Sequence, residues 1–373
     1  MPFWRRRSPA PLCIALIGLC SCGGSGDPAT SPGNTPVAIG GILYGAAAAD
    51  GGVAAYAINA SDGALTPIAG SPFGAEAPEP AAFAKWLSTN PARSAVYLAV
   101  ANATIESWSV NPTTGMPTAT SGAPFAIALN GRIAVSPDGN RVFAPTSAGL
   151  AAYGIGADGA IAAVDARSSA PGSGAAAAVT PDGRFVYLAS GPGQSRISTF
   201  SVSSATGALS LLAVSTLAAS DTVYPGDAGM AISPNGQFLY LSSRSTVGRI
   251  EAYTIDSSTG GLSPINGSPF TAPASPKELV LDPTGKFLFL ATGSGVAAYA
   301  VDAVSGALTA ASGSPFGVSS TAHLAVDASG HFLYATYLSS PIAAYTIDQK
   351  TGALSAIAAS PFGTGVGDLA ILK

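Results

Sequence analysis

The 373-residue sequence has few of the side chains on which metal and disulfide chemistry depends. It contains two histidines, His323 and His331, so a metal centre held by several histidines is excluded. Its three cysteines all lie within the first 22 residues, so the rest of the chain cannot form an internal disulfide bond. We expect neither a metal ion nor another cofactor.

Charged residues are scarce as well, at 10% of the chain, and the formal net charge is −4. Without residues 1–21, 13 basic residues remain against 20 acidic ones, a net charge of −7. This acidic balance argues against nonspecific binding to nucleic acid. The chain also lacks the G-x-S-x-G elbow of serine hydrolases and the G-x-x-x-x-G-K-[ST] loop that binds phosphates.

The N-terminus has no apolar run long enough to cross a bilayer, but it has the order of an export signal. Three arginines at positions 5–7 precede an apolar run over residues 12–19. Leu19-Cys20-Ser21-Cys22 resembles the lipobox of bacterial lipoproteins and predicts a lipid on Cys22. The alternative is that these cysteines are incidental to the signal.

We therefore expect a signal peptide over residues 1–21 and a flexible tether rich in Gly, Ser, Pro and Thr over residues 22–37. The mature protein would be exported and held in the bacterial cell envelope by its N-terminal lipid. We expect it to be a monomer.

Repetition dominates the remaining sequence, residues 38–373. Seven copies of one phrase each have an aromatic residue on an apolar stretch, a turn with glycine, and a second short apolar stretch. The turn glycines recur at steps of 44–53 residues, close to the roughly 40–50 residues of a β-propeller blade. They are Gly63, Gly115, Gly159, Gly207, Gly260, Gly306 and Gly352.

A second repeated phrase lies between these copies, as in AAVTPDGRFVYLAS and MAISPNGQFLYLSS. Alternating apolar residues around a Pro/Gly turn indicate strand, turn and strand. We predict an all-β, seven-bladed β-propeller with four-stranded antiparallel blades. A lone first strand near Asp368 ends the chain, and a second strand near Gly41 begins the repeats. The C-terminal strand is thus predicted to complete the N-terminal blade and close the ring.

The phrases PDGRFVYLAS, AAYTID, TGALS and SPF at this spacing resemble the bacterial lactonase-type seven-bladed propeller family, which includes 6-phosphogluconolactonases and YVTN-repeat surface proteins. The resemblance covers about residues 38–373 and implies lactone hydrolysis. Members commonly place His, often after Arg, before an inner strand. Here Ala322-His323 keeps the His without the Arg. Export also disfavours a cytosolic phosphosugar lactone as the substrate.

One position varies between the repeats, five residues before the turn that follows each inner strand. It shares a strand face with the small residues three before the turn, where seven strands converge on the axis. We predict a polar pocket at this mouth of the channel, with open space at its two smallest members. The occupants are Trp86, Arg132, Ala176, Gly229, Glu278, His323 and Asp368.

The four charged members suit the opening of a lactone. Glu278 or Asp368 beside His323 would raise the basicity of the imidazole, which would activate water, while Arg132 would stabilise the oxyanion. Solvated ion pairs at strand entrances are the alternative. The two carboxylates and His323 could also hold a divalent ion, but no ligand-spacing motif supports this.

Three further residues are candidates for ligand binding. Trp86 could stack on a sugar, Lys277 directly precedes Glu278, and Asp227 lies in a loop that lacks the repeated Pro-Phe ending. The leading interpretation is an envelope-anchored module that binds a small molecule, a glycan or an envelope protein. Hydrolysis of an unphosphorylated sugar or other lactone is the competing one.

Overall fold

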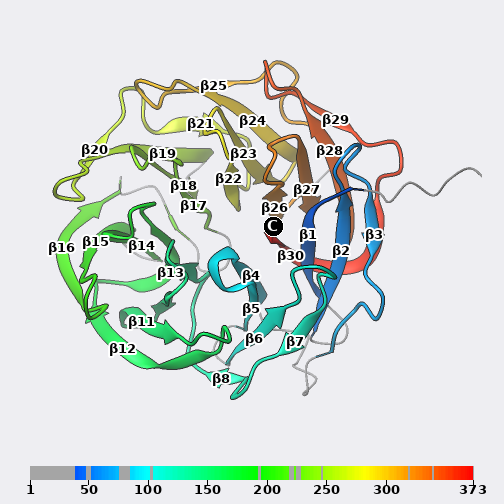
Figure 1. Ribbon diagram of the computed structural model, residues 1–373. Helices are drawn as coiled ribbons and strands as arrows, with labels where there is room; N and C mark the ends of the chain where they lie inside the picture. Colours follow the sequence, from blue (N-terminus) through cyan, green and yellow to red (C-terminus); the bar gives the residue numbers. More distant parts are fainter. Residues whose placement is uncertain are drawn as a thin grey trace, which may run out of the picture. The chain divides into compact units, whose positions relative to one another are not determined.

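Antiparallel strands make up most of the described chain in this computed structural model (Figure 1). The structure describes residues 38–47, 52–74, 85–100, 104–191, 195–217, 222–223, 228–244, 247–317, 320–337 and 340–372. The predicted signal peptide and tether lie outside these residues. No helix within the described ranges is long and apolar enough to cross a membrane.

The strands form seven blades arranged as a ring, which confirms the predicted fold (Figure 1). In order from the inner strand outward, blade 1 contains β30 (Phe362–Leu372), β1 (Ile39–Ala47), β2 (Val53–Asn59) and β3 (Leu65–Pro67); blade 2 contains β4 (Lys85–Asn90), β5 (Ala95–Val100), β6 (Thr104–Val110), β7 (Pro117–Ala119) and β8 (Phe125–Ala126); blade 3 contains β9 (Ala134–Val135), β10 (Arg141–Thr146), β11 (Gly149–Ile155) and β12 (Ile161–Ser169). Blade 4 contains β13 (Ser173–Val179), β14 (Phe185–Gly191), β15 (Arg196–Val202) and β16 (Leu209–Thr216); blade 5 contains β17 (Met230–Ile232), β18 (Phe238–Arg244), β19 (Gly248–Ile255), β20 (Leu262–Pro264) and β21 (Phe270–Ala272). Blade 6 contains β22 (Leu279–Leu281), β23 (Phe287–Thr292), β24 (Gly295–Val301) and β25 (Leu308–Ala310), and blade 7 contains β26 (His323–Val326), β27 (Phe332–Thr336), β28 (Ser340–Ile347) and β29 (Leu354–Ala356). A short 3₁₀ turn, η1 (Pro91–Arg93), joins β4 to β5.

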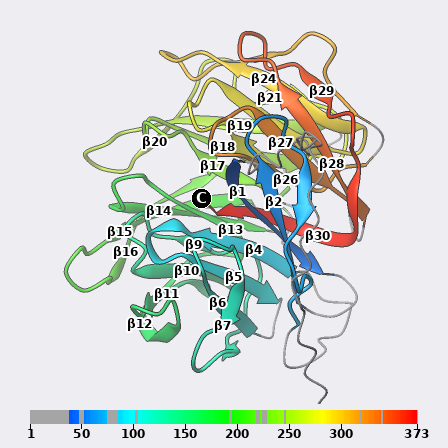
Figure 2. The ribbon, with the colours of Figure 1, turned by 45° about the vertical axis from the view of Figure 1, so that its right-hand side comes forward.

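The last strand, β30, closes the ring as predicted. Its second half pairs antiparallel with β1, where Ala370 lies opposite Tyr44. Its first half pairs with β28, where Phe362 lies opposite Ile342. The one strand therefore ends the outer side of blade 7 and forms the inner strand of blade 1. Figure 2 shows β30 beside β1, where the last and the first described strands pair.

The aromatic residues of the repeated phrase fill the spaces between blades. Each is at most 8% exposed, so these rings belong to the core and cannot form a row of sugar-stacking platforms. Phe125 of the Pro-Phe ending in blade 2 packs edge-on against Tyr153 of blade 3, with ring centroids 5.6 Å apart. The core aromatics are Tyr56, Trp108, Tyr153, Phe200, Tyr253, Tyr299 and Tyr345.

Five tyrosine hydroxyls tie one blade to the next. Each lies on the second strand of a blade and donates a hydrogen bond of 2.7–3.0 Å to the carbonyl of the turn glycine in the following blade. These turns need glycine: Gly260 has a φ of 72°, and a Cβ there would lie 2.5 Å from the ring of Phe185. The pairs are Tyr44 with Gly115, Tyr97 with Gly159, Tyr187 with Gly260, Tyr240 with Gly306 and Tyr334 with Gly63.

Replacing Tyr187 with phenylalanine is expected to lower the free energy of unfolding by about 1–3 kcal/mol, because the buried carbonyl of Gly260 loses its donor. Tyr345→Phe is the matched control, since that hydroxyl makes no hydrogen bond with any described residue. Its effect should stay below about 0.5 kcal/mol. Urea denaturation of both variants makes the comparison, and equal effects would contradict a role for the inter-blade bond.

Candidate functional site

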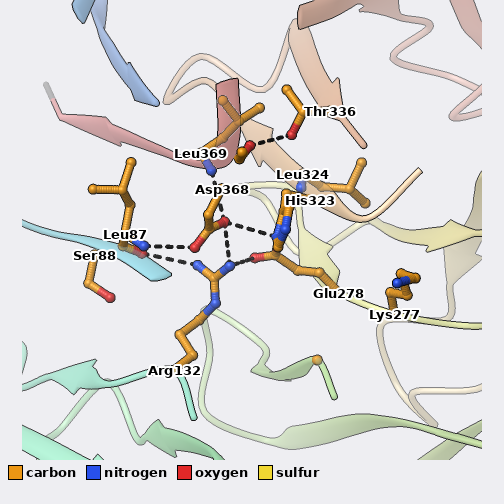
Figure 3. A network of polar contacts seen from close by, with 12 residues as sticks. Leu87, Ser88, Arg132, Lys277, Glu278, His323, Leu324, Thr336, Asp368 and Leu369 are labelled. Atoms are coloured by element: carbon orange, nitrogen blue, oxygen red, sulfur yellow. Dashed lines mark hydrogen bonds and ion pairs between the residues drawn. The ribbon is translucent and has the colours of Figure 1, made fainter. Parts of the chain in front are cut away.

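Four of the predicted residues meet in one polar network at the inner strands of the ring (Figure 3). Arg132 precedes β9 of blade 3, Glu278 precedes β22 of blade 6, His323 begins β26 of blade 7, and Asp368 lies in β30 of blade 1. We call these four side chains the channel cluster. Four blades therefore contribute one charged group each, and residues up to 236 positions apart in the chain come into contact.

Asp368 is the buried centre of the cluster, with a fully buried side chain. Its Oδ1 accepts a hydrogen bond of 2.5 Å from Nη2 of Arg132 and lies 3.2 Å from Nδ1 of His323. Its Oδ2 accepts a hydrogen bond of 2.7 Å from the backbone N–H of Leu87 in blade 2. A buried carboxylate needs such partners because its desolvation is otherwise unfavourable.

Glu278 forms the second carboxylate of the cluster. Its Oε1 lies 2.9 Å from Nη2 of Arg132, and its Oε2 lies 3.3 Å from Nδ1 of His323. The same Oε2 accepts a hydrogen bond of 3.2 Å from the backbone N–H of Leu324. Arg132 also donates from Nη1 to the carbonyl of Leu87 at 3.1 Å. Each cation therefore faces both carboxylates.

The charges within the cluster shift the pKa values of His323 and Asp368. Burial alone would lower the pKa of His323, but the neighbouring carboxylates of Asp368 and Glu278 raise this pKa to about 9. Burial alone would raise the pKa of Asp368, but Arg132 and His323 lower it to about 2. At neutral pH His323 is therefore an imidazolium beside an ionised Asp368. Its other ring nitrogen, Nε2, makes no hydrogen bond with a described residue.

The cluster is only partly open to solvent. The side chains of Arg132, His323 and Glu278 are 25%, 18% and 12% exposed. Two cations and one carboxylate of the cluster are thus partly accessible from solvent, while Asp368 is covered.

Trp86 does not join the cluster, contrary to the prediction. Its side chain is 4% exposed and packs in a hydrophobic core with Tyr97, Ile105 and Ile133 between blades 2 and 3. The alternation of side chains along β4 correctly placed Trp86 on the same strand face as Ser88, but blade 3 covers this face. Burial of the large apolar indole against blade 3 is favourable in free energy.

The predicted open space at Ala176 and Gly229 is also absent. Ala176 is 3% exposed and forms a parallel bridge with Arg132. A Cβ on Gly229 would lie 2.3 Å from the backbone nitrogen of Leu279 and 2.8 Å from Cα of Glu278. Small residues stand at these positions because the backbone of a neighbouring blade passes against them, blade 3 at Ala176 and blade 6 at Gly229.

Gly229→Ala is expected to push the backbone of Glu278 away from Arg132 and to lower the free energy of unfolding by about 1–3 kcal/mol. Gly74→Ala is the matched control, because a Cβ there meets no atom within 4 Å. That control should change stability by less than about 0.5 kcal/mol. Thermal and urea unfolding compare the two variants, and a neutral Gly229→Ala would show that this close contact relaxes without cost.

Lys277 lies beside the cluster and outside its contacts. Figure 3 shows its side chain directed away from the ion pairs, and its Nζ lies 5.8 Å from the ring centroid of Tyr337. Asp227 and Cys22, the other predicted ligand and lipid sites, lie outside the described residues. His331 is exposed, and its Nδ1 lies 3.0 Å from Oγ of Ser329, as expected for a solvated turn residue.

A divalent cation fits this donor set poorly. One ligand atom each of Glu278, His323 and Asp368 lies within 4.8 Å of the others. However, the guanidinium of Arg132 already bridges both carboxylates at 2.5 and 2.9 Å. A metal ion would have to displace this cation and meet a protonated His323, so the residues favour an ion-pair network.

Sequence reasoning missed the groups that position the charged side chains. The backbone N–H groups of Leu87 and Leu324 leave no trace in residue type. Thr336 lies opposite His323 in the β26–β27 pair, and its Oγ1 donates a 2.5 Å hydrogen bond to the carbonyl of Gly367. The position of Thr336 beside His323 follows from the register in which β26 and β27 pair. A single sequence does not give that register.

A separate cleft of about 710 Å³ lies between blades 2 and 3, and no member of the channel cluster lines it. Its walls include Phe125, Ile127, Tyr153 and Ile161 and carry no charged residue. General acid–base chemistry needs titratable groups, so the channel cluster is the better candidate site.

Comparisons with known proteins agree with the fold. Residues 193–314 match the model of a family described as lactonase, 7-bladed beta-propeller. A structure of a 6-phosphogluconolactonase candidate from Bacteroides uniformis is 20% identical, with a TM-score of 0.71, over 89% of this chain and 98% of that one. The corresponding candidate from Bacteroides fragilis is 17% identical, with a TM-score of 0.69, over 92% and 100% of the two chains. The periplasmic gluconolactonase of Pseudomonas aeruginosa is 17% identical, with a TM-score of 0.68, over 89% and 99%. No match was found among curated proteins.

Proposed function

Because the chain belongs to the lactonase-type family of seven-bladed β-propellers, we propose that it hydrolyses a lactone at the channel cluster. The observation that carries the proposal is the meeting of Arg132, Glu278, His323 and Asp368 from four blades in one partly exposed cluster. The names of the similar structures, a gluconolactonase and two 6-phosphogluconolactonase candidates, support this chemistry.

The protonation of the cluster assigns roles that differ from the first hypothesis. With a pKa of about 9, His323 already carries its proton at neutral pH and is a donor rather than a base. Its Nε2–H and the guanidinium of Arg132 would stabilise the oxyanion that forms on the lactone carbonyl. The partly exposed carboxylate of Glu278 would accept the proton of the attacking water.

The reaction then balances without a further reagent. The water oxygen forms a bond to the carbonyl carbon, and the bond between this carbon and the ring oxygen breaks. The proton held by Glu278 passes to the departing ring oxygen, which becomes a hydroxyl group. Asp368, buried behind the cations, would keep His323 protonated and oriented without touching the substrate.

A lactone panel tests the proposal. D-Glucono-1,5-lactone, D-galactono-1,4-lactone, δ-valerolactone and γ-butyrolactone are unphosphorylated, in keeping with the predicted export. Acid release above the spontaneous rate is measured with a pH indicator for the wild type and for His323→Ala. We expect turnover of at least one lactone and at least a hundredfold slower turnover in the variant. Absence of turnover across the panel would overturn the proposal.

Binding without hydrolysis is the second candidate, and one observation favours it. Each cation already has both carboxylates as partners, so the cluster is stable without a substrate. Such a network can donate and accept hydrogen bonds to a small polar molecule or a glycan. Calorimetric binding of a sugar by a protein that turns over none of the lactones would select this function.

We also propose that the propeller acts in the bacterial cell envelope, held by a lipid on Cys22. This proposal is supported by the three arginines that precede the apolar run over residues 12–19 and by the Leu19-Cys20-Ser21-Cys22 sequence. Cell fractionation of Cys22→Ala should move the protein from the membrane fraction to the soluble one. Full retention in the membrane fraction would show that another segment anchors the protein.

A further inference from the structure

The outer edges of blades 3 and 4 differ from those of the other five blades. In those five, the strand after the turn glycine has three residues, and a proline stands five residues beyond its end. Proline has no N–H to offer to a further strand, so it protects a sheet edge from pairing. Blades 3 and 4 have no proline at this place, and their outer strands β12 and β16 run for nine and eight residues. The five prolines are Pro72, Pro124, Pro269, Pro315 and Pro361.

The outer strand of blade 4, β16, is also free of charge. Its sequence LSLLAVST has no charged residue, whereas β12 contains Asp165 and Arg167. Charged residues on an edge strand oppose pairing with another chain, and a long uncharged edge favours it. Among the described outer strands, β16 is therefore the one that has neither the proline nor a charge to protect it.

Apolar side chains of β16 are open to solvent. Leu211, Leu212 and Val214 are 40%, 49% and 38% exposed, and they are three of the eight exposed large hydrophobic residues in the described part of the chain. The strand lies at the rim of the ring, and of the described strands only β15 pairs with it (Figure 1). The register with β15 skips Leu212, a bulge that adds twist but no charge. The outer edge of β16 thus combines a backbone that no described strand pairs with and an apolar surface.

We propose that β16 is an interaction surface for a second copy of this chain, with the two β16 strands antiparallel across a twofold axis. Antiparallel pairing of identical strands is self-complementary, because each copy presents the same edge. The lack of charge on β16 favours this partner. The chain has a net charge of −4, so two copies repel each other at long range, but no like charges meet between the paired strands. The sequence led us to expect a monomer, and this edge points instead to a reversible dimer.

The size of the edge sets the strength of the dimer. Stable interfaces use about 20–30 residues from each partner. The β16 strand offers eight, three of them exposed large hydrophobic residues. We therefore expect weak association, with a dissociation constant of roughly 10–100 μM.

Sedimentation equilibrium of the full chain over about 5–200 μM tests the proposal. A reducing agent is present, because the three cysteines near the N-terminus would otherwise link copies by disulfide bonds. Leu212→Lys should raise the dissociation constant at least about tenfold, since each copy brings a positive charge into the contact. Val304→Lys is the matched control. This side chain is 91% exposed and lies between β24 and β25 of blade 6, so the same charge there should leave the dimer unchanged.

Two further measurements identify the surface that associates. Hydrogen exchange followed by mass spectrometry should slow over residues 209–216 at high protein concentration, and it should not slow in Leu212→Lys. Raising the salt concentration from about 0.05 to about 0.5 M should strengthen association, because salt screens the repulsion between two acidic copies. A wild type that stays monomeric at the highest concentration, association that persists in Leu212→Lys, or weakening by salt would overturn the proposal.

Discussion

Replacing Arg132 with alanine is expected to slow lactone hydrolysis by at least a hundredfold and to lower the free energy of unfolding by about 3–5 kcal/mol. The reason is the burial of its partner: the fully buried side chain of Asp368 would keep its charge but lose a 2.5 Å ion pair. Glu278 would lose its 2.9 Å contact as well. Urea denaturation and the lactone assay measure the two effects separately.

A double substitution separates the two roles of this arginine. Arg132→Met combined with Asp368→Leu removes one cation and one anion and leaves His323 with Glu278. Apolar replacement of a whole buried ion pair is often close to neutral, so most of the lost stability should return, whereas hydrolysis should not. Arg184→Ala is the matched control, because this exposed arginine bonds to the carbonyl of Ser257, and less than about 1 kcal/mol should be lost. Return of activity in the double variant would contradict the catalytic role.

The stability of the protein is expected to fall by about 3 kcal/mol between pH 6.5 and pH 9. His323 has a pKa of about 9 in the folded protein against an ordinary value of 6.5, so its contribution is fully present below pH 6.5 and is lost as the pH rises through 9. Asp368 acts at the other end, with stability present above its ordinary pKa of 3.8 and lost as the pH falls through about 2. Unfolding curves from pH 5.5 to 9.5 measure the first effect.

His323→Gln should remove this pH dependence, because the only other histidine, His331, is exposed in a turn. The measurements stop below pH 10, because at higher pH the tyrosines also make the stability depend on pH. Burial raises the pKa of tyrosines such as Tyr187 above its value in the unfolded chain. Lactone hydrolysis corrected for its spontaneous rate should also decline above pH 9, as the imidazolium loses its proton. A rise through pH 9 would show instead that neutral His323 is the general base.

The repeats allowed the fold to be predicted almost completely, because each copy of a blade carries the same turn and strand signals. The shared blade followed from a lone first strand at the end of the repeats and a second strand at their beginning, and β30 lies beside β1 as expected. The dual pairing of β30 could not be predicted in the same way. In blade 7 the Pro-Phe segment that ends the blade, at Phe362, runs without a break into the inner strand of blade 1, and the dual pairing depends on this continuity.

Alignment of the repeats also located the four charged residues, because a charged residue at a position that differs between otherwise similar repeats is easy to recognise. It failed at Trp86 and Gly229, where residue type alone does not tell whether a side chain faces the channel or a neighbouring blade. At Gly229 the missing side chain reflects the backbone of Glu278 at close range and not a cavity.

The position of β30 after all other strands of the ring makes the assembly of the cluster depend on the strand that is translated last among them. A ribosome makes strands β1 to β29 before it makes β30. A chain that stops after β29 therefore has blade 1 without its inner strand. Such a chain also has Arg132 and His323 without the carboxylate of Asp368 that they share. Premature termination would therefore leave an open ring with two adjacent cations, a species that cellular proteases can remove before it reaches its place of action.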